Sequence, residues 1–196
     1  MKQSALVQHH LEAKASMGQR HGWTVALRFS NPEDEAAAAT QAAGLADVSD
    51  LTKVDVSAAM PPQAPFDCWT LGRRHYLVTA PAEQRQQVVA ALGDTAIDIT
   101  SAYAGFLLTG PKSRDTLRKL TSLNVSDKAM PNRSCRQAGL AHVHSTIIRK
   151  DLGDTVAFTI LVARDYAEDV WESILHAGGE FGIAQIGWDA LERVGA

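Results

Sequence analysis

The sequence is poor in several features that mark particular classes of protein. Its 196 residues include only two cysteines, Cys68 and Cys135, which lie far apart and form no C-x-x-C pair. We therefore expect free thiols in a reducing compartment, with neither a zinc motif nor a redox motif. No apolar run approaches the ~18 residues that span a bilayer. The formal net charge is −3, so no basic excess favours a nucleic-acid partner.

The first residues, "MKQSALVQHHLEAK", lack the continuous apolar core of a signal peptide, so we expect a cytoplasmic location. The composition is 45% hydrophobic and 21% charged, which is enough apolar material for a proper core. We expect residues 1–20 to form a short N-terminal helix or a loose arm, followed by one domain over residues 21–196. The proline-rich stretch at residues 60–65 is the best candidate for a subdomain boundary.

Local patterns predict hairpins interleaved with strand-to-helix units. A first strand is expected over residues 22–29, followed by a helix that Ser30 or Asn31 caps, with Pro32 in its first turn and Gly44 ending it. Residues 51–57 alternate as a strand with one buried face, which places Lys53 on the opposite face. Residues 67–80 predict a hairpin that turns near residues 71–73.

A strand then passes directly into a helix three times, at "HYLVTAPAEQRQQVVAALG", "GFLLTGPKSRDTLRKLTSL" and "FTILVARDYAEDVWESILHAG". Pro81 and Pro111 are expected at first helical positions, and Leu117, Leu120 and Leu123 are expected to share a stripe. Residues 134–163 predict two strands joined by a turn at residues 150–154. This mixed order indicates an α+β layered domain with largely antiparallel sheets.

The junction at Gly110 and Pro111 raises the question of an anion site, because a strand that ends at a helix N-terminus can bind phosphate. Lys112 and Arg114 follow at once, which would suit an anion. However, a phosphate loop needs several free backbone N–H groups, and here proline supplies none while Gly110 is the only glycine. We therefore favour a tight structural junction over an anion site.

A pair of histidines and a single cysteine are the first residues with possible chemistry. His142 and His144 are two apart on an expected strand, so they would share a face and could bind a metal together, but no third ligand lies nearby in sequence. Cys135 is flanked by Arg133 and Arg136, which would lower its thiol pKa. No orienting His–Asx pair accompanies it, so half-exposed histidines and a small buried thiol are the favoured interpretations.

Two acids and two aromatic residues complete the candidates. Asp94 is expected to be a turn residue after a glycine, whereas Asp98 lies in an otherwise apolar strand and most simply bonds a neighbouring backbone group. Trp171 and Tyr166 would form a stacking wall for a flat ligand, or more simply belong to a core or interface stripe. The sequence contains no serine-hydrolase elbow, Walker loop or dinucleotide fingerprint.

Two stretches resemble a known family. "AGLADVSDLTKVDVS" is similar to the opening of the folate-binding aminomethyltransferases, which include the T-protein of the glycine cleavage system. The stretch from residue 96 to 182 resembles one branch of that superfamily, the gamma subunit of heterotetrameric sarcosine oxidase. The similarity rests on segments 110–117, 131–137 and 161–171, which occur in order with the right gaps, and it extends over roughly residues 43–187.

The resemblance implies an α+β folate-domain fold of antiparallel sheets, packed helices and internal pseudo-repeats. It also implies a non-catalytic subunit that packs against large alpha and beta subunits, which would hold FAD, FMN, NAD and folate. Catalytic members carry an acidic loop before the strand "HYLVTA" and a Gly-Tyr-Thr-Gly-Glu turn, and both are missing here. We therefore assign no catalytic, cofactor-binding or metal residue, and interpret Arg114 and Arg118 as partner or sheet contacts. The alternative is a stand-alone tetrahydrofolate-binding or tetrahydrofolate-dependent transferase.

Overall fold

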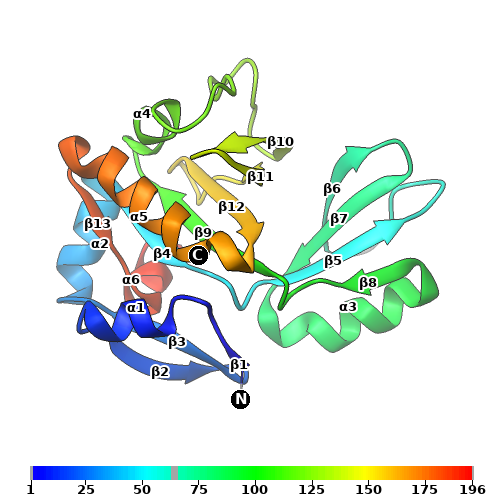
Figure 1. Ribbon diagram of the computed structural model, residues 1–196, viewed down its shortest axis with the longest axis horizontal. Helices are drawn as coiled ribbons and strands as arrows, with labels where there is room; N and C mark the ends of the chain where they lie inside the picture. The colour runs from blue at the N-terminus through cyan, green and yellow to red at the C-terminus, as the bar shows by residue number, and fades with distance from the viewer. Residues whose placement is uncertain (1, 63–65, 196) are drawn as a thin grey trace.

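A computed structural model describes residues 2–62 and 66–195, and Figure 1 shows the chain as a lobe of β5 to β8 beside a larger lobe. Part of the expected boundary at residues 60–65 lies outside the described residues, so the division of the chain into domains stays a prediction. The strands are β1 (Lys2–Gln3), β2 (Ser16–Arg20), β3 (Trp23–Arg28), β4 (Ala43–Asp47), β5 (Thr52–Ser57), β6 (Asp67–Gly72), β7 (His75–Ala80), β8 (Ala96–Asp98), β9 (Tyr103–Thr109), β10 (Ser134–Leu140), β11 (Val143–Arg149), β12 (Ala157–Ala163) and β13 (Ile183–Gln185). The α-helices are α1 (Val7–Glu12), α2 (Pro32–Gln41), α3 (Arg85–Leu92), α4 (Ser113–Arg118), α5 (Ala167–Gly178) and α6 (Trp188–Arg193).

Within the described residues the strands form three sheets. A six-stranded sheet has the order β10-β11-β12-β9-β4-β13, a four-stranded sheet has the order β6-β7-β5-β8, and β1-β3-β2 form the third. The pairings are antiparallel except that β13 lies parallel to β4 and β1 lies parallel to β3. The predicted α+β class with largely antiparallel sheets is therefore confirmed.

The six-stranded sheet carries the largest core. Its central strands β9 and β12 are apolar on both faces, because α5 covers one face and α2 and α6 lie against the other. On α5, Val170, Trp171 and Ile174 are fully buried and pack with Phe106 of β9. Trp171 therefore belongs to a core stripe, which was the simpler of its two interpretations. Tyr166, which was expected to share it, precedes the helix and is 50% exposed.

The N-terminal part follows its local sequence signals with two corrections. Residues 7–12 form helix α1, and the predicted strand at residues 22–29 corresponds to β3, but β1 and β2 precede it. Asn31 caps α2 by accepting a hydrogen bond from the Glu33 N–H at 2.9 Å, as expected. The helix ends at Gln41, however, and Gly44 lies inside β4 because the chain enters the six-stranded sheet directly after the helix.

Further differences concern the later elements. The expected pair of strands over residues 134–163 is three strands, because β10 and β11 form a hairpin through Ala141 and His142, both with positive φ. Helix α4 ends at Arg118, while Leu120 and Leu123 pack on the core from the following loop. Pro81 and Pro111 precede their helices rather than opening them. The predicted hairpin of β6 and β7 is confirmed.

Candidate functional site

A cavity of about 300 Å³ lies where residues from all three sheets meet. Its volume is at the lower end of the range for small-molecule sites, ~300–1,000 Å³. Side chains of the four-stranded sheet, the six-stranded sheet, the end of β2 and helix α6 form its wall. Its lining residues are Arg20, His21, Val48, Asp50, Leu51, Asp67, Trp69, Thr79, Pro81, Ala82, Glu83, Leu107, Ile148, Lys150, Leu152, Thr159 and Trp188.

Asp50 is the most unusual group in this wall. It is only 4% exposed, and its Oδ1 atom has no hydrogen-bond partner within the described residues. Burial, and next the negative charge of Asp47, raise the pKa of Asp50 to about 6, against the opposing effects of Arg20 and Lys53. A carboxylate with an unpaired oxygen in a cavity wall can accept a hydrogen bond from a bound ligand.

Two tryptophans and an arginine give the cavity a flat, polarisable surface. Trp69 of β6 donates its Nε1–H to Thr79 Oγ1 at 2.8 Å, which fixes its ring. Trp188 opens α6, and its buried Nε1–H has no acceptor among the described residues. The guanidinium carbon of Arg20 lies 4.0 Å from the Trp188 ring centroid, and Arg20 also forms an ion pair with Glu192 at 2.7 Å.

Asp47, three residues before Asp50, is instead fully engaged. Its Oδ2 atom accepts hydrogen bonds from His10 Nε2 at 3.0 Å and Ser4 Oγ at 2.5 Å, and its Oδ1 atom accepts from Ser49 N and Oγ. Burial alone would raise the pKa of Asp47, but the hydrogen bonds from His10, Ser4 and Ser49 outweigh it and lower the pKa. The network ties the N-terminal segment to the six-stranded sheet.

Lys53 is near these acids. It was predicted to lie on the open face of its strand, and this prediction is wrong. The side chain is fully buried, and its Nζ donates to the carbonyl oxygens of Ser49 and Leu51 at 2.9 Å and of Thr100 at 3.2 Å. Burial lowers the pKa of Lys53 to about 8, although the nearby carboxylates, Asp50 first, oppose this. The ammonium holds the loop that shapes the cavity floor.

The Gly110 junction is a packing feature. Gly110 has a φ of 110°, and an added Cβ would lie 2.4 Å from the Ala39 oxygen and 2.6 Å from the Ala42 oxygen. The Gly110 N–H donates to Val156 O, and the Lys112 N–H donates to Ala42 O. Because these donors are used inside the fold, the structural interpretation of this junction is favoured over an anion site.

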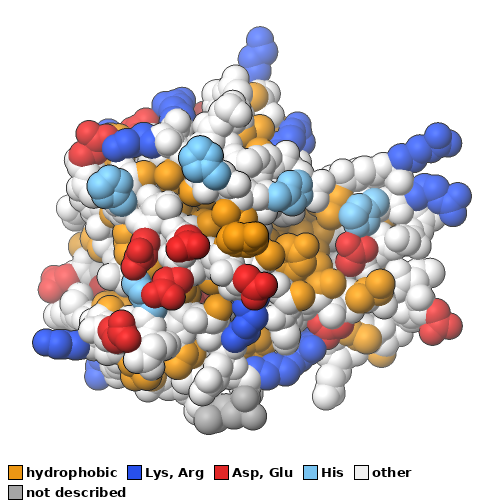
Figure 2. All heavy atoms as spheres, in the orientation of Figure 1, with side chains coloured by type: hydrophobic (Ala, Val, Ile, Leu, Met, Phe, Trp, Pro, Cys, Tyr) orange, Lys and Arg blue, Asp and Glu red, His pale blue; other side chains and the backbone are white. Residues whose placement is uncertain are grey.

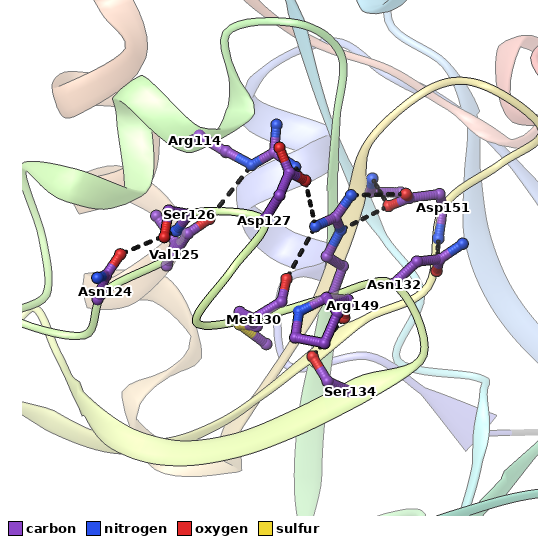
Figure 3. A network of polar contacts seen from close by, with 12 residues as sticks. Arg114, Asn124, Val125, Ser126, Asp127, Met130, Asn132, Ser134, Arg149 and Asp151 are labelled. Carbon is purple, nitrogen blue, oxygen red and sulfur yellow. Dashed lines mark hydrogen bonds and ion pairs between the residues drawn. The ribbon is translucent and has the colours of Figure 1, made fainter.

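Arg114 forms its contacts within the chain, with the loop that follows α4. Its Nε donates to Val125 O at 3.2 Å, and its guanidinium pairs with Asp127 (Figure 3). Arg149 reaches the same carboxylate at 2.6 Å and also binds Asp151 at 2.8 Å. This network fixes the loop between α4 and β10. Arg118, in contrast, is 57% exposed and pairs only with Asp115 within the described residues.

The other predicted candidates lie apart from the cavity. His142 is in the turn between β10 and β11, whereas His144 is on β11, and both are exposed. The prediction that they share a face of one strand is therefore wrong. Cys135 is buried, and burial raises the pKa of its thiol to about 11 although Arg136 opposes this, which disfavours the thiolate. Cys68 and Cys135 are free thiols.

Asp94 and Asp98, the two acids considered as candidates, also lie in structural elements apart from the cavity. Asp98 accepts a hydrogen bond from the Thr100 N–H at 2.9 Å, the backbone contact expected for it, and pairs with Arg85 at 2.6 Å. Asp94 lies in the 3₁₀ turn that follows α3. Trp171 is a core residue, so it and Tyr166 form no stacking wall. None of these residues lines the cavity.

Comparison with known proteins decides the family. The sequence model of the GCVT N-terminal domain matches residues 66–194, well over half of the chain. The chain belongs to this family. It is therefore a member of the T-protein superfamily, as the resemblance implied, and the folate-domain fold is shared. Within the described residues, no helix is both long enough and apolar enough to cross a membrane.

Its curated relatives include aminomethyltransferases and oxidase subunits. An aminomethyltransferase of Bacillus subtilis is 26% identical over 210 residues, which cover 88% of this chain and 58% of that protein. Sarcosine oxidase subunit alpha of Rhizobium meliloti is 28% identical over 95 residues, which cover 47% of this chain and 10% of that protein. The chain thus spans a tenth of the oxidase subunit and little more than half of the aminomethyltransferase.

Two solved structures share the fold. Glycine cleavage system aminomethyltransferase T from Bartonella henselae superposes with a TM-score of 0.77 at 17% identity, covering 96% of this chain and 60% of that chain. A chain of heterotetrameric sarcosine oxidase from Corynebacterium sp. U-96 gives a TM-score of 0.61 at 18% identity, covering 79% of this chain and 94% of that chain.

Sequence reasoning did not find the cavity. Asp50 and Lys53 lie in the stretch that carries the family resemblance, but an acid and a lysine near a strand give no local sign of burial. The contact between His10 and Asp47 joins residues 37 positions apart. The available signal was the density of polar residues in "DVSDLTK", which is unusual for a segment at the edge of two buried strands.

Proposed function

We propose that the chain is a non-catalytic, gamma-type subunit of a sarcosine oxidase-like complex that oxidises N-methyl amino acids in one-carbon metabolism. Large alpha and beta subunits would hold FAD, FMN and NAD and carry out the chemistry. The observation that carries this proposal is the fold match to a chain of heterotetrameric sarcosine oxidase, 94% of which is covered, together with the sequence similarity to sarcosine oxidase subunit alpha. The missing acidic loop and Gly-Tyr-Thr-Gly-Glu turn support it as well.

Exposed hydrophobic side chains offer a surface for such partners. Ile97 on β8 is 67% exposed and Tyr166 before α5 is 50% exposed. Figure 2 shows hydrophobic side chains in the hollow between the lobe of β5 to β8 and the rest of the molecule. Large apolar groups that lie open to water favour contact with another protein.

Co-expression with the genes that flank it tests the proposal. We expect the chain to co-purify in one complex with large flavin-containing subunits, and we expect oxidation of sarcosine or a related N-methyl amino acid to fall when the chain is omitted. Replacing Ile97 and Tyr166 by serine should weaken co-purification, whereas Leu11→Ser, which alters an equally exposed residue on α1, should not. A monomeric chain whose absence leaves the activity unchanged would refute the proposal.

A second candidate function is tetrahydrofolate binding, and the cavity favours it. Its volume of about 300 Å³ accommodates a ring system, and Asp50 Oδ1 and Trp188 Nε1 supply one unpaired acceptor and one unpaired donor. These groups fit the N–H donors and acceptors of a pteridine ring. Calorimetry with tetrahydrofolate should give saturable heat with the wild type and none with Asp50→Ala. The absence of heat at high micromolar folate would exclude this candidate and leave the subunit proposal intact.

A further inference from the structure

Outside the cavity, three potential metal ligands meet between the N-terminal helix and α5. The Nδ1 atom of His9 lies 3.8 Å from Glu168 Oε1 and 4.0 Å from Glu172 Oε1, and the three ligand atoms all lie within 4.8 Å of one another. Figure 2 shows acidic side chains gathered around a histidine on the face that carries α1 and α5. The sequence interval between His9 and Glu168 makes this a tertiary cluster that local patterns do not reveal.

The separations suit an ion better than a direct hydrogen bond. Both exceed the ~2.7–3.2 Å range of a nitrogen–oxygen hydrogen bond. Neither exceeds twice the ~2.0–2.2 Å that separates Zn²⁺ from an imidazole nitrogen or a carboxylate oxygen. An ion between the histidine and either glutamate therefore reaches both atoms at ordinary bond lengths, and small rotations of the exposed glutamates complete the set.

The histidine is held in place while the carboxylates remain open. The His9 side chain is 18% exposed, and its ring lies edge-on to Trp171, with centroids 6.4 Å apart, and to His10 at 6.0 Å. Glu168 and Glu172 are one turn apart on α5, so their side chains share a face. One fixed nitrogen and two adaptable oxygens form the three-ligand set of an open zinc site.

The charge balance of the cluster also favours a cation. Like charges spaced four apart on a helix repel each other. Among the described residues, no lysine or arginine pairs with Glu168 or Glu172, and His9 is their only ion-pair partner. Imidazole suits zinc, whereas an all-oxygen set would suit magnesium or calcium.

We propose that His9, Glu168 and Glu172 bind a divalent transition-metal ion of the zinc class, with water in the remaining position. The ion links α1 to α5 and so fixes the N-terminal segment against the six-stranded sheet. The link also positions the adjacent His10, which pairs with Asp47. Binding to the folded state alone raises the stability of the chain with ion concentration.

Titration of the full, metal-free chain with Zn²⁺ tests this proposal. We expect saturable binding of one ion by calorimetry and a rise in melting temperature with added Zn²⁺. His9→Gln and Glu172→Gln should each weaken binding at least about tenfold, since each removes one of three ligands. Glu172 is exposed, so its replacement by the isosteric amide leaves the fold intact, which circular dichroism checks.

Two matched variants separate this site from adventitious binding. His144→Gln removes an exposed histidine on β11 and should leave the affinity unchanged. His176→Gln removes the exposed histidine one turn beyond Glu172 and should change it less than twofold. The proposal is overturned if Zn²⁺ gives no saturable heat at millimolar concentration, or if affinity depends on His176 or His144 and not on His9.

Discussion

Asp47 and Asp50 are buried acids three residues apart on the same segment, yet their surroundings give them opposite properties. Asp47 accepts hydrogen bonds at both oxygens from His10, Ser4 and Ser49, which lowers its pKa. Asp50 has an unpaired oxygen in the cavity wall, and burial raises its pKa to about 6. Burial alone therefore does not set the role of a carboxyl group: hydrogen bonds make Asp47 structural, and an unpaired oxygen leaves Asp50 able to accept a hydrogen bond from a ligand.

Removing the Asp47 carboxylate should have the largest effect. Asp47→Ala leaves His10, Ser4 and Ser49 without their common acceptor in the core, and we expect the free energy of unfolding to fall by about 3–5 kcal/mol, as for other broken buried pairs. Urea denaturation measures the loss. Asp55→Ala is the control, because Asp55 pairs with the 43% exposed His75 on the surface and should cost less than ~1 kcal/mol. Equal losses in the two variants would contradict the structural role of Asp47.

Asp50→Asn should remove a loss of stability that the wild type shows as the pH rises. Because the folded pKa lies above the ordinary 3.8, Asp50 stabilises the fold fully below pH 3.8, and this contribution is lost as the pH rises through about 6. The difference corresponds to up to about 3 kcal/mol. We therefore expect the wild type to lose stability between pH 4 and pH 7 relative to Asp50→Asn, measured by urea denaturation at each pH. Parallel curves would show that Asp50 is not perturbed.

The Asp47 network should show the reverse behaviour in acid. Its folded pKa is lowered, so its contribution is present above pH 3.8 and is lost as the pH falls through the folded value. In melting curves below pH 4, the wild type should lose stability relative to Asp47→Asn. Asp50→Asn retains Asp47, so it should lose stability in acid in parallel with the wild type. If both variants respond alike to acid, the contrast between the two acids fails.

Ser4→Ala should have the smallest effect of the series. It removes one of the donors to Asp47 and the acceptor of the Leu6 N–H, while His10 and Ser49 remain in place. A single neutral hydrogen-bonding group is typically worth ~1 kcal/mol. Combining Ser4→Ala with Asp47→Ala should cost less than the sum of the two single losses, because only the contact of Ser4 with the Leu6 N–H remains to be lost. Full additivity in this double-mutant cycle would show that the two residues do not interact.

Elements with strong local signals could be predicted from the sequence. Asn31 and Pro32 mark the start of α2, the apolar stretch before the Gly110 junction marks β9, and the apolar stretch at Ala157–Ala163 marks β12. The β10–β11 hairpin was missed because Ala141 and His142 adopt positive φ values that favour glycine or asparagine, so the turn has no sequence signature. Tertiary contacts impose that conformation.

The candidate site was beyond sequence reasoning for a related reason. Burial of Lys53 depends on three carbonyl groups, one of them at Thr100, which lies 47 residues away. Arg114 was interpreted as a partner or sheet contact, but it binds the loop at Val125 and Asp127 of its own chain. Such contacts arise when three sheets come together, and no local periodicity encodes them. The resemblance supplied the fold, whereas only the packing shows which polar groups lack partners.

The burial of Lys53 makes it an internal reporter of unfolding. Amine-reactive reagents modify lysines that meet solvent as neutral amines. Burial lowers the pKa of Lys53 to about 8, which would make its amine reactive at mildly alkaline pH. The side chain is nevertheless fully buried, so reagents in solvent cannot reach it. Brief labelling at mildly alkaline pH should therefore modify surface lysines such as Lys150 and leave Lys53 intact. Any label found at residue 53 by mass spectrometry would count the molecules that had opened, so one side chain records how often the fold comes apart.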